Sequence, residues 1–200
     1  MSLPRILLLG DSIRMSYQGL IKALLEQQAE VVYPSVNCTD TRYTRAHLEA
    51  WLTEFQPDTV HWNNGLHDLR HAKGQPECQV PLDEYRENLS AMADRLATAY
   101  PGKVIWATST PVIEEWHNPV RSFDRYNDDI AVYNQTALEI MYAHEFRVTD
   151  LGALVCSHAK ERIILRSDGV HYNDQGRLLL AGAVIAQLRS LLGLPQAVIN

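Results

Sequence analysis

Three residues with the chemistry of nucleophilic catalysis lie near opposite ends of this 200-residue sequence. Ser12 follows the apolar run Arg5–Leu9 and directly precedes a helical pattern. A serine where a buried strand meets a helix has an exposed hydroxyl and unpaired backbone N–H groups around it. That hydroxyl is a weak nucleophile until a base takes its proton. Asp168 and His171 are three residues apart in a glycine-containing loop, a spacing that lets the carboxylate hold one imidazole nitrogen while the other faces the serine.

Each of these residues also has an ordinary structural interpretation. Ser12 alone would most often cap the first helix, and Asp168 alone would be a turn residue beside Gly169. His171 alone would be a surface histidine at the start of a helix. The three together favour a nucleophile, a general base and an orienting carboxylate.

The elements that must position these residues alternate along the chain. Short apolar runs predict strands, and between them apolar residues recur at three- and four-residue steps, which predicts helices. Alternation of this kind indicates a parallel sheet with helices on both faces and right-handed crossovers. We expect a single domain over residues 1–200, with its core over about 5–192. The five expected strands are Arg5–Leu9, Val31–Tyr33, Thr59–Trp62, Val104–Ala107 and Phe146–Val148.

Segments that follow strands of such a sheet meet at one edge, where ligands bind. Ser12 and residues 35–43, 63–68 and 108–111 should therefore lie close together. Residues 70–80 and the long stretch to about Arg125 are expected to be irregular. Trp116 and Phe123 in that stretch either line a pocket or only anchor the loop.

The composition excludes several classes of protein. The chain is 46% hydrophobic and 21% charged with a net charge of −6, which argues against nucleic acid or anionic membranes as partners. No apolar run approaches the roughly 20 residues that span a bilayer. Three cysteines without close spacing indicate free thiols in a reducing compartment. No leader is visible, so a cytoplasmic location is expected, with a trimmed leader as the alternative.

A metal or nucleotide cofactor is not expected. His67, Asp68 and His71 have a spacing that would share one helical face, but Gly65 and Gly74 argue against a helix and no further ligand is evident. The glycine patterns of dinucleotide and phosphate loops are missing.

Two blocks of the sequence resemble those of the GDSL, or SGNH, hydrolase family. These are Gly10-Asp11-Ser12 near the start and Asp168-Gly169-Val170-His171 before the last helix, and the strand order between them also matches. The resemblance implies a flavodoxin-like three-layer α/β/α sandwich with a five-stranded parallel sheet, and hydrolysis of esters or thioesters. Ser12 would be the nucleophile, His171 the general base and then acid, and Asp168 the orienting carboxylate.

The family also implies an oxyanion hole with three donors, of which the backbone N–H of Ser12 is one. The second is a glycine N–H in the loop after the second strand, but residues 35–43 contain no glycine. Any residue other than proline has an N–H, so Cys38 or Thr39 is expected to serve there.

The third donor is the asparagine side chain of a Gly-x-Asn-Asp block, which here is Gly65-Leu66-His67-Asp68. His67 occupies the asparagine position, and a neutral imidazole N–H can also donate. We expect Asn64 to be the amide donor, with His67 lining the site.

The expected substrate is an ester of a small acyl group, such as acetyl, on a polar molecule such as a carbohydrate. This rests on a polar edge of Arg14, Asn63, Asn64 and His67 and on the lack of a long apolar lid. Arg14 either contacts the substrate or lies in solvent. An acyltransferase and a non-catalytic small-molecule-binding domain that keeps the fold remain alternatives.

Overall fold

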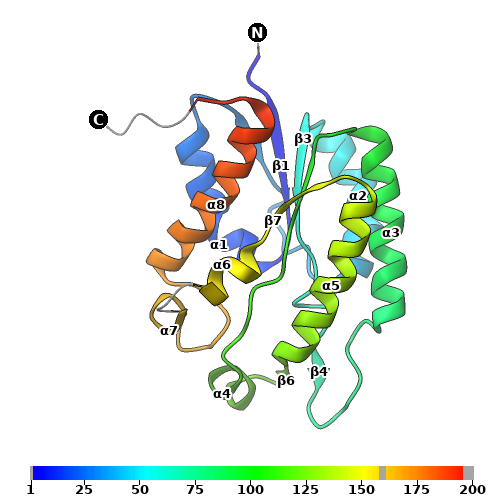
Figure 1. Cartoon of the computed structure of the whole chain (residues 1–200), viewed down its shortest axis with the longest axis vertical. Helices are drawn as coiled ribbons and strands as arrows, with labels where there is room; N and C mark the ends of the chain where they lie inside the picture. Colours follow the sequence, from blue (N-terminus) through cyan, green and yellow to red (C-terminus); the bar gives the residue numbers. More distant parts are fainter. Residues whose placement is uncertain (1, 158–160, 196–200) are drawn as a thin grey trace.

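The computed structural model describes residues 2–157 and 161–195 and contains a five-stranded parallel sheet (Figure 1). The strand order is β2-β1-β3-β5-β7, which is the flavodoxin-like order. All five strands lie within one residue of their predicted positions. They are β1 (Arg5–Leu9), β2 (Glu30–Val32), β3 (Thr59–Trp62), β5 (Val104–Ala107) and β7 (Arg147–Thr149).

The central strands are apolar because both of their faces are covered. Every residue of β3 and β5 is buried, as is β1 after Arg5. In the register, Leu9 pairs with Trp62, and Trp62 pairs with Trp106. The two indole rings meet edge to face with centroids 4.8 Å apart. The three strands therefore end at nearly the same level, which places the residues after them along one edge.

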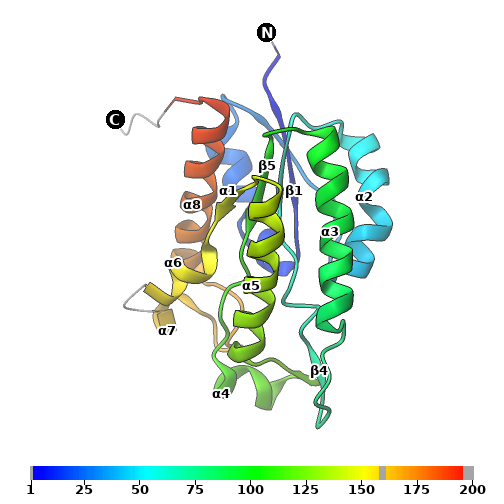
Figure 2. The same ribbon diagram turned by 45° about the vertical axis from the view of Figure 1, so that its right-hand side comes forward.

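Helices form a layer on each face of the sheet, as Figure 2 shows from a second direction. The helices α1 (Ser12–Leu25) and α8 (Asp174–Leu192) pack together on one face. The helices α2 (Thr41–Phe55), α3 (Leu82–Ala99) and α5 (Asn127–Ala143) cover the other face. The prediction of a three-layer sandwich is confirmed.

The cap of α1 is Asp11 rather than Ser12. The Asp11 carboxylate accepts a hydrogen bond from the backbone N–H of Ile13 at 2.9 Å. Asp11 thus satisfies one unpaired donor of the first turn. Ser12 is the first helical residue, so the interpretation of Ser12 as the cap is wrong.

The expectation of irregular chain over residues 70–80 and 112–125 is also wrong in part. Strands β4 (His71–Ala72) and β6 (Phe123–Asp124) pair antiparallel and form a separate small sheet beyond the carboxyl ends of the central strands (Figure 1). Between β5 and β6 lie α4 (Glu114–His117) and a 3₁₀ turn (Asn118–Val120). The remaining helices of the described residues are α6 (Leu151–Ser157) and α7 (Glu161–Ile164). Among the described residues, no helix is long and apolar enough to cross a membrane.

Candidate active site

The structure brings Ser12, His171 and Asp168 together across 159 residues of sequence. The Ser12 Oγ and the His171 Nε2 are 2.9 Å apart, and the His171 Nδ1 and the Asp168 Oδ2 are 2.6 Å apart. With a proton on Nδ1, the imidazole donates to the carboxylate and leaves Nε2 free to accept the serine proton. This is the arrangement that activates a serine for attack on a carbonyl carbon.

A tight turn positions the carboxylate and the imidazole. Asp168 Oδ1 accepts hydrogen bonds from the backbone N–H groups of Val170 and His171, at 3.1 and 3.0 Å. Gly169 has a φ of 70°, and a Cβ there would lie 2.6 Å from the carbonyl oxygen of Ile113. Both the backbone conformation and the lack of space require glycine at this position.

The surroundings of Asp168 keep it ionised. Its partial burial by itself would raise its pKa, but the hydrogen bonds from the His171 side chain and from the two backbone N–H groups outweigh burial. They hold the pKa of Asp168 well below its usual range. The Arg121 guanidinium also donates to Asp168 Oδ2 at 2.9 Å. The carboxylate is therefore charged and able to stabilise an imidazolium.

Arg14 supports the turn that carries Ser12, and it does so from inside the protein. Its guanidinium is fully buried and donates to the carbonyl oxygens of Gly10, Pro34 and Val36. Arg14 thus joins the end of β1 to the loop after β2. The two roles expected for it, in solvent or on the substrate, are both wrong, because its donors are used within the fold.

The two backbone donors expected in the loop after β2 already have partners. The Cys38 N–H donates to the Gly10 carbonyl at 3.2 Å, and the Thr39 N–H donates to the Asn37 side chain at 2.8 Å. Thr39 has a φ of 47°, a left-handed conformation that favours glycine. This chain therefore keeps the backbone shape that a glycine would give, without the glycine. Whether Cys38 or Thr39 donates to an oxyanion stays a prediction.

The expected amide donor, Asn64, lies inside the protein. Its Nδ2 donates to the Thr39 carbonyl at 3.1 Å and to the Thr44 hydroxyl at 2.9 Å. Its Oδ1 accepts from the Trp62 indole N–H at 2.7 Å, and none of the residue is exposed. Because both amide hydrogens are used, Asn64 as placed here has none to offer to a substrate.

His67 is left as the side-chain candidate in this block. Its Nε2 accepts a hydrogen bond from Arg70 at 3.1 Å, so the ring proton belongs on Nδ1. Burial, together with the nearby charges of Arg70 and Arg125, lowers the pKa of His67 to about 4, although Asp11 opposes this. The ring is neutral near pH 7, and among the described residues Nδ1 has no hydrogen-bond partner. His67 thus has one N–H available for donation.

The cavity beside Ser12 contains residues that the sequence did not indicate. It has a volume of about 150 Å³. It is lined by Ser12, Leu66, Arg70, Arg121, Phe123, Arg125, Val170 and His171. Three arginines thus surround Ser12. Of the two aromatic residues expected either to line a pocket or to anchor the loop, Phe123 lines this cavity. Trp116 is partly buried and packs against the core.

Arg125 joins the walls of this cavity. Its Nε donates to the Leu66 carbonyl at 2.6 Å, and its Nη1 donates to the His117 Nε2 at 3.3 Å. The other nitrogen of His117 donates to the Asp168 carbonyl at 3.2 Å. A chain of hydrogen bonds thus connects the loop after β3 to the turn that holds Asp168. The sequence gives little indication of this chain of hydrogen bonds beyond the presence of Arg70, Arg121 and Arg125 in the two loop segments.

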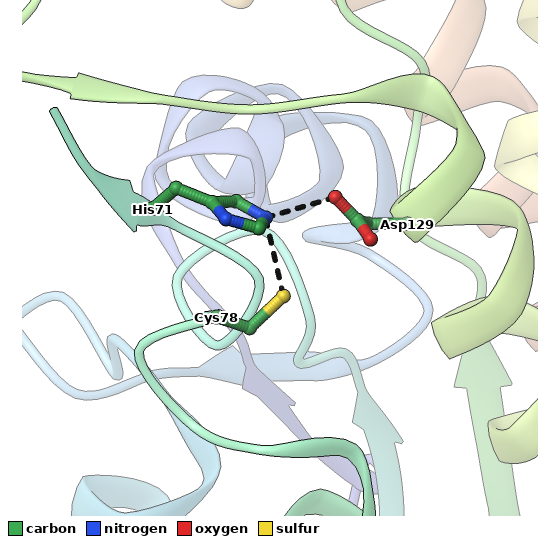
Figure 3. A group of neighbouring side chains, drawn as sticks. All are labelled: His71, Cys78 and Asp129. Carbon is green, nitrogen blue, oxygen red and sulfur yellow. Dashed lines mark hydrogen bonds and ion pairs between the residues drawn. The ribbon is translucent and has the colours of Figure 1, made fainter. Parts of the chain in front are cut away.

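The metal site considered from the sequence, His67, Asp68 and His71, does not form as a group. Asp68 accepts hydrogen bonds from the Thr41 N–H and hydroxyl, and His67 is used by Arg70. His71 instead lies with Cys78 and Asp129 (Figure 3). Among the described residues, this is the group of three whose nitrogen, sulfur and oxygen atoms converge on one point.

The fold and the family together define the class of the protein, a hydrolase that acts on ester bonds. Residues 8–178 match the GDSL-like lipase/acylhydrolase family. The chain belongs to that family, and the resemblance read from its first and last blocks is confirmed.

Known proteins of similar sequence and fold are consistent with this. The isoamyl acetate-hydrolyzing esterase 1 homolog of Mus musculus is 26% identical over 194 residues, covering 88% of this chain and 78% of the mouse protein. The human homolog is 25% identical over the same shares. A lipase/acylhydrolase from Enterococcus faecalis has the same fold, with a TM-score of 0.79 at 22% identity over 98% of this chain and all of that one. An acetylxylan esterase from Geobacillus stearothermophilus has a TM-score of 0.75 at 20% identity, covering 92% and 94% of the two chains.

Proposed function

We propose that the protein is a serine esterase that removes small acyl groups, such as acetyl, from a polar substrate such as a carbohydrate. The observation that carries this proposal is the continuous hydrogen-bond chain from the Ser12 hydroxyl through His171 to Asp168. The proposal assigns Ser12 as the nucleophile, His171 as the general base and acid, and Asp168 as the orienting carboxylate.

The reaction follows from the protons of these three groups. As the Ser12 Oγ attacks the acyl carbon, its proton passes to the His171 Nε2, and Asp168 stabilises the imidazolium that forms. The tetrahedral intermediate then collapses, and the leaving alcohol takes the proton from His171. A water molecule, activated in the same way, releases the acid from Ser12. Each proton transfer uses the same nitrogen, which explains why one histidine is enough.

Two observations support a small acyl group. The cavity beside Ser12 holds about 150 Å³, which accommodates a short acyl chain more readily than a long one. The curated relatives are named for an acetate ester. A polar substrate was expected from a polar edge of four residues, Arg14, Asn63, Asn64 and His67, but all four are buried. The three arginines of the cavity lining take their place as polar groups beside Ser12.

A fluorophosphonate probe tests the assignment of the nucleophile. We expect labelling of the wild-type protein at Ser12 and none of Ser12→Ala, with Ser16→Ala as the matched control one turn later in the same helix. Absence of labelling in a folded wild-type protein would overturn the proposal and favour the binding-domain alternative.

A panel of 4-nitrophenyl esters tests the size of the acyl group. We expect kcat/KM to be highest for acetyl and to fall as the acyl chain lengthens. Higher turnover on long chains than on acetyl would contradict the small-acyl assignment. Adding an alcohol to the same assay and measuring new ester against free acid separates acyl transfer from hydrolysis.

A further inference from the structure

The cavity beside Ser12 has three cationic walls that the esterase reaction does not by itself require. Arg70 precedes β4, Arg121 follows the 3₁₀ turn, and Arg125 follows β6. In a cavity of about 150 Å³, a group bound next to Ser12 lies within reach of all three guanidinium groups.

The positive charge of Arg70 and Arg125 is only partly compensated. Neither forms an ion pair with a carboxylate among the described residues, and the Arg70 Nε is buried without a hydrogen-bond partner. Burial, and then repulsion from Arg70, lower the pKa of Arg125 to about 9, although Asp11 opposes this. Arg125 is thus still a cation at neutral pH, in a place where a cation is costly. An anion in the cavity would offset that cost.

The guanidinium groups are also held in place before any ligand binds. The Phe123 ring lies under both Arg70 and Arg125, at 4.3 and 5.0 Å from the ring centroid. Arg125 is further fixed by the Leu66 carbonyl and by His117. Stacked, hydrogen-bonded arginines lose little freedom on binding and match the two oxygens of a carboxylate.

We infer that this cavity binds a carboxylate carried by the substrate, so that the preferred esters are anionic. The inference rests on the proposed esterase function and adds a class of substrate to it. Arg70 and Arg125 would contact the carboxylate. Arg121 is shared with Asp168, so its first role is at the catalytic carboxylate.

Matched pairs of esters test this inference, with one pair for each side of the scissile bond. The pair 4-acetoxybenzoate and methyl 4-acetoxybenzoate places the charge on the alcohol side, with acetate release as the readout. The pair mono-4-nitrophenyl succinate and 4-nitrophenyl pentanoate places it on the acyl side. We expect the anionic member of one pair to have the higher kcat/KM, by about tenfold to a hundredfold, and the preference to weaken with added salt.

Variants of Arg70 show whether that preference comes from the cavity. Arg70→Gln should lower the ratio of kcat/KM between the anionic and the neutral member of the preferred pair toward one, mainly through the KM of the anionic ester, and Arg70→Lys should restore part of that ratio. Arg45→Gln, which removes an exposed arginine paired with Glu87, is the control.

Two results would overturn the inference while the proposed function stands. One is equal kcat/KM within both ester pairs. The other is an equal loss of kcat on neutral and anionic esters in Arg70→Gln, which would assign Arg70 to the oxyanion instead. Failure of the proposed function is different, because then no ester is hydrolysed and Ser12 is not labelled.

A second observation, independent of the first, concerns His71, Cys78 and Asp129. The His71 Nε2 lies 2.9 Å from the Asp129 Oδ2 and 3.3 Å from the Cys78 Sγ. The three ligand atoms all lie within 4.8 Å of one another, and the side chains point toward the same spot from β4, from the loop before α3 and from the first turn of α5 (Figure 3).

The Nε2 atom of His71 is the ring nitrogen that faces the other two side chains. The other nitrogen, Nδ1, lies 3.3 Å from the Gln75 carbonyl, which only accepts, so Nδ1 carries a hydrogen. In a neutral ring Nε2 then has a lone pair that faces the Asp129 carboxylate. A metal ion between Nε2 and the Asp129 carboxylate would be bound by both.

We infer that His71, Cys78 and Asp129 bind a divalent transition-metal ion, with zinc as the best match to nitrogen, sulfur and carboxylate ligands. A histidine whose second nitrogen donates to a backbone carbonyl is the usual form of a metal-bound imidazole. Water would complete the coordination. The ion would join β4 to α5 and so hold the small sheet that carries Phe123, with Arg70 directly before it.

Metal analysis and cobalt titration of the purified protein test this site. We expect about one equivalent of zinc or cobalt per chain, and a near-ultraviolet absorption from the cobalt–thiolate bond. Cys78→Ser and His71→Gln should lose both signals, whereas Cys156→Ser, at an exposed cysteine, should keep them. Zinc should raise the Tm of the wild type and of Cys156→Ser only. Binding well below one equivalent, or binding unchanged in Cys78→Ser, would overturn the inference.

Discussion

The two walls of the Ser12 cavity are built in different ways. The wall proposed to transfer protons, called here the proton-transfer wall, is one short segment, in which Asp168 and His171 are joined by hydrogen bonds within a four-residue turn. The opposite wall combines Leu66 and Arg125, which are 59 residues apart and connected through a side chain and a carbonyl. Local geometry thus produces the Asp168–His171 pair, whereas tertiary contacts produce the opposite wall.

The largest effect is expected on the proton-transfer wall, from Asp168→Asn. An amide at this position no longer stabilises the imidazolium and favours the wrong tautomer of His171, so kcat should fall by about 10⁴. Steady-state kinetics on 4-nitrophenyl acetate measures this, and circular dichroism verifies the fold. A loss smaller than tenfold would show that the carboxylate is only a turn residue.

The pH profile of the wild type follows from the same carboxylate. Because the pKa of Asp168 is held well below its usual range, Asp168 stays ionised under mildly acidic conditions. Loss of kcat/KM as the pH falls should then follow a single proton taken up by His171, because a protonated imidazole cannot accept the serine proton. Rates measured on the acidic side at constant ionic strength test this. Two protons in the acidic limb would contradict it.

A smaller effect is expected on the opposite wall, from His67→Ala. If the Nδ1–H of His67 donates to the oxyanion, kcat should fall by about 10² to 10³ on every ester, with little change in KM. His67→Asn restores an amide donor and should recover part of the rate. A change confined to the KM of anionic esters would instead show that His67 acts only by holding Arg70.

Asn64→Ala separates a structural residue from a functional one. It leaves the Trp62 indole N–H and the Thr39 carbonyl without the partner that Asn64 provides, so the free energy of unfolding should fall by about 2 kcal/mol or more. The kcat of the folded enzyme should stay within a few-fold of the wild type. Urea unfolding and active-site titration measure the two quantities, and a loss of kcat as large as that of His67→Ala would return Asn64 to the oxyanion hole.

The last effect concerns stability as a function of pH and leaves the rate aside, and it comes from Asp68→Asn. Burial raises the pKa of Asp68 to about 7, even though hydrogen bonds from Thr41 oppose it. The folded state therefore keeps a proton that the unfolded chain releases near pH 4, and stability from this group is lost as the pH rises toward 7. The loss is about 1.4 kcal/mol per pH unit in that window. Urea unfolding between pH 4 and 8 should show a flatter curve for the variant, and parallel curves would contradict this origin.

Features set by local sequence could be predicted, whereas features set by tertiary contacts could not. The five strands were predictable because both of their faces are buried and apolar, and the Asp168–His171 pair was predictable because its geometry is set within three residues. The β4–β6 pairing was not, since each strand has only two residues and its partner lies about 50 positions away. The burial of Arg14 and Asn64 was also hidden, because a polar side chain in sequence gives no sign of the carbonyls and hydroxyls that surround it in the fold.

The separation of the small β4–β6 sheet from the five-stranded sheet has a consequence for how specificity can diverge. Its strands pair only with each other among the described strands, so the segments that carry Arg70 and Phe123 can change without altering the register of β1, β3 or β5. A lineage could therefore exchange substrates by mutating or grafting these two segments while it inherits an intact Ser12. The same boundary marks where a designer should cut to build chimeric esterases.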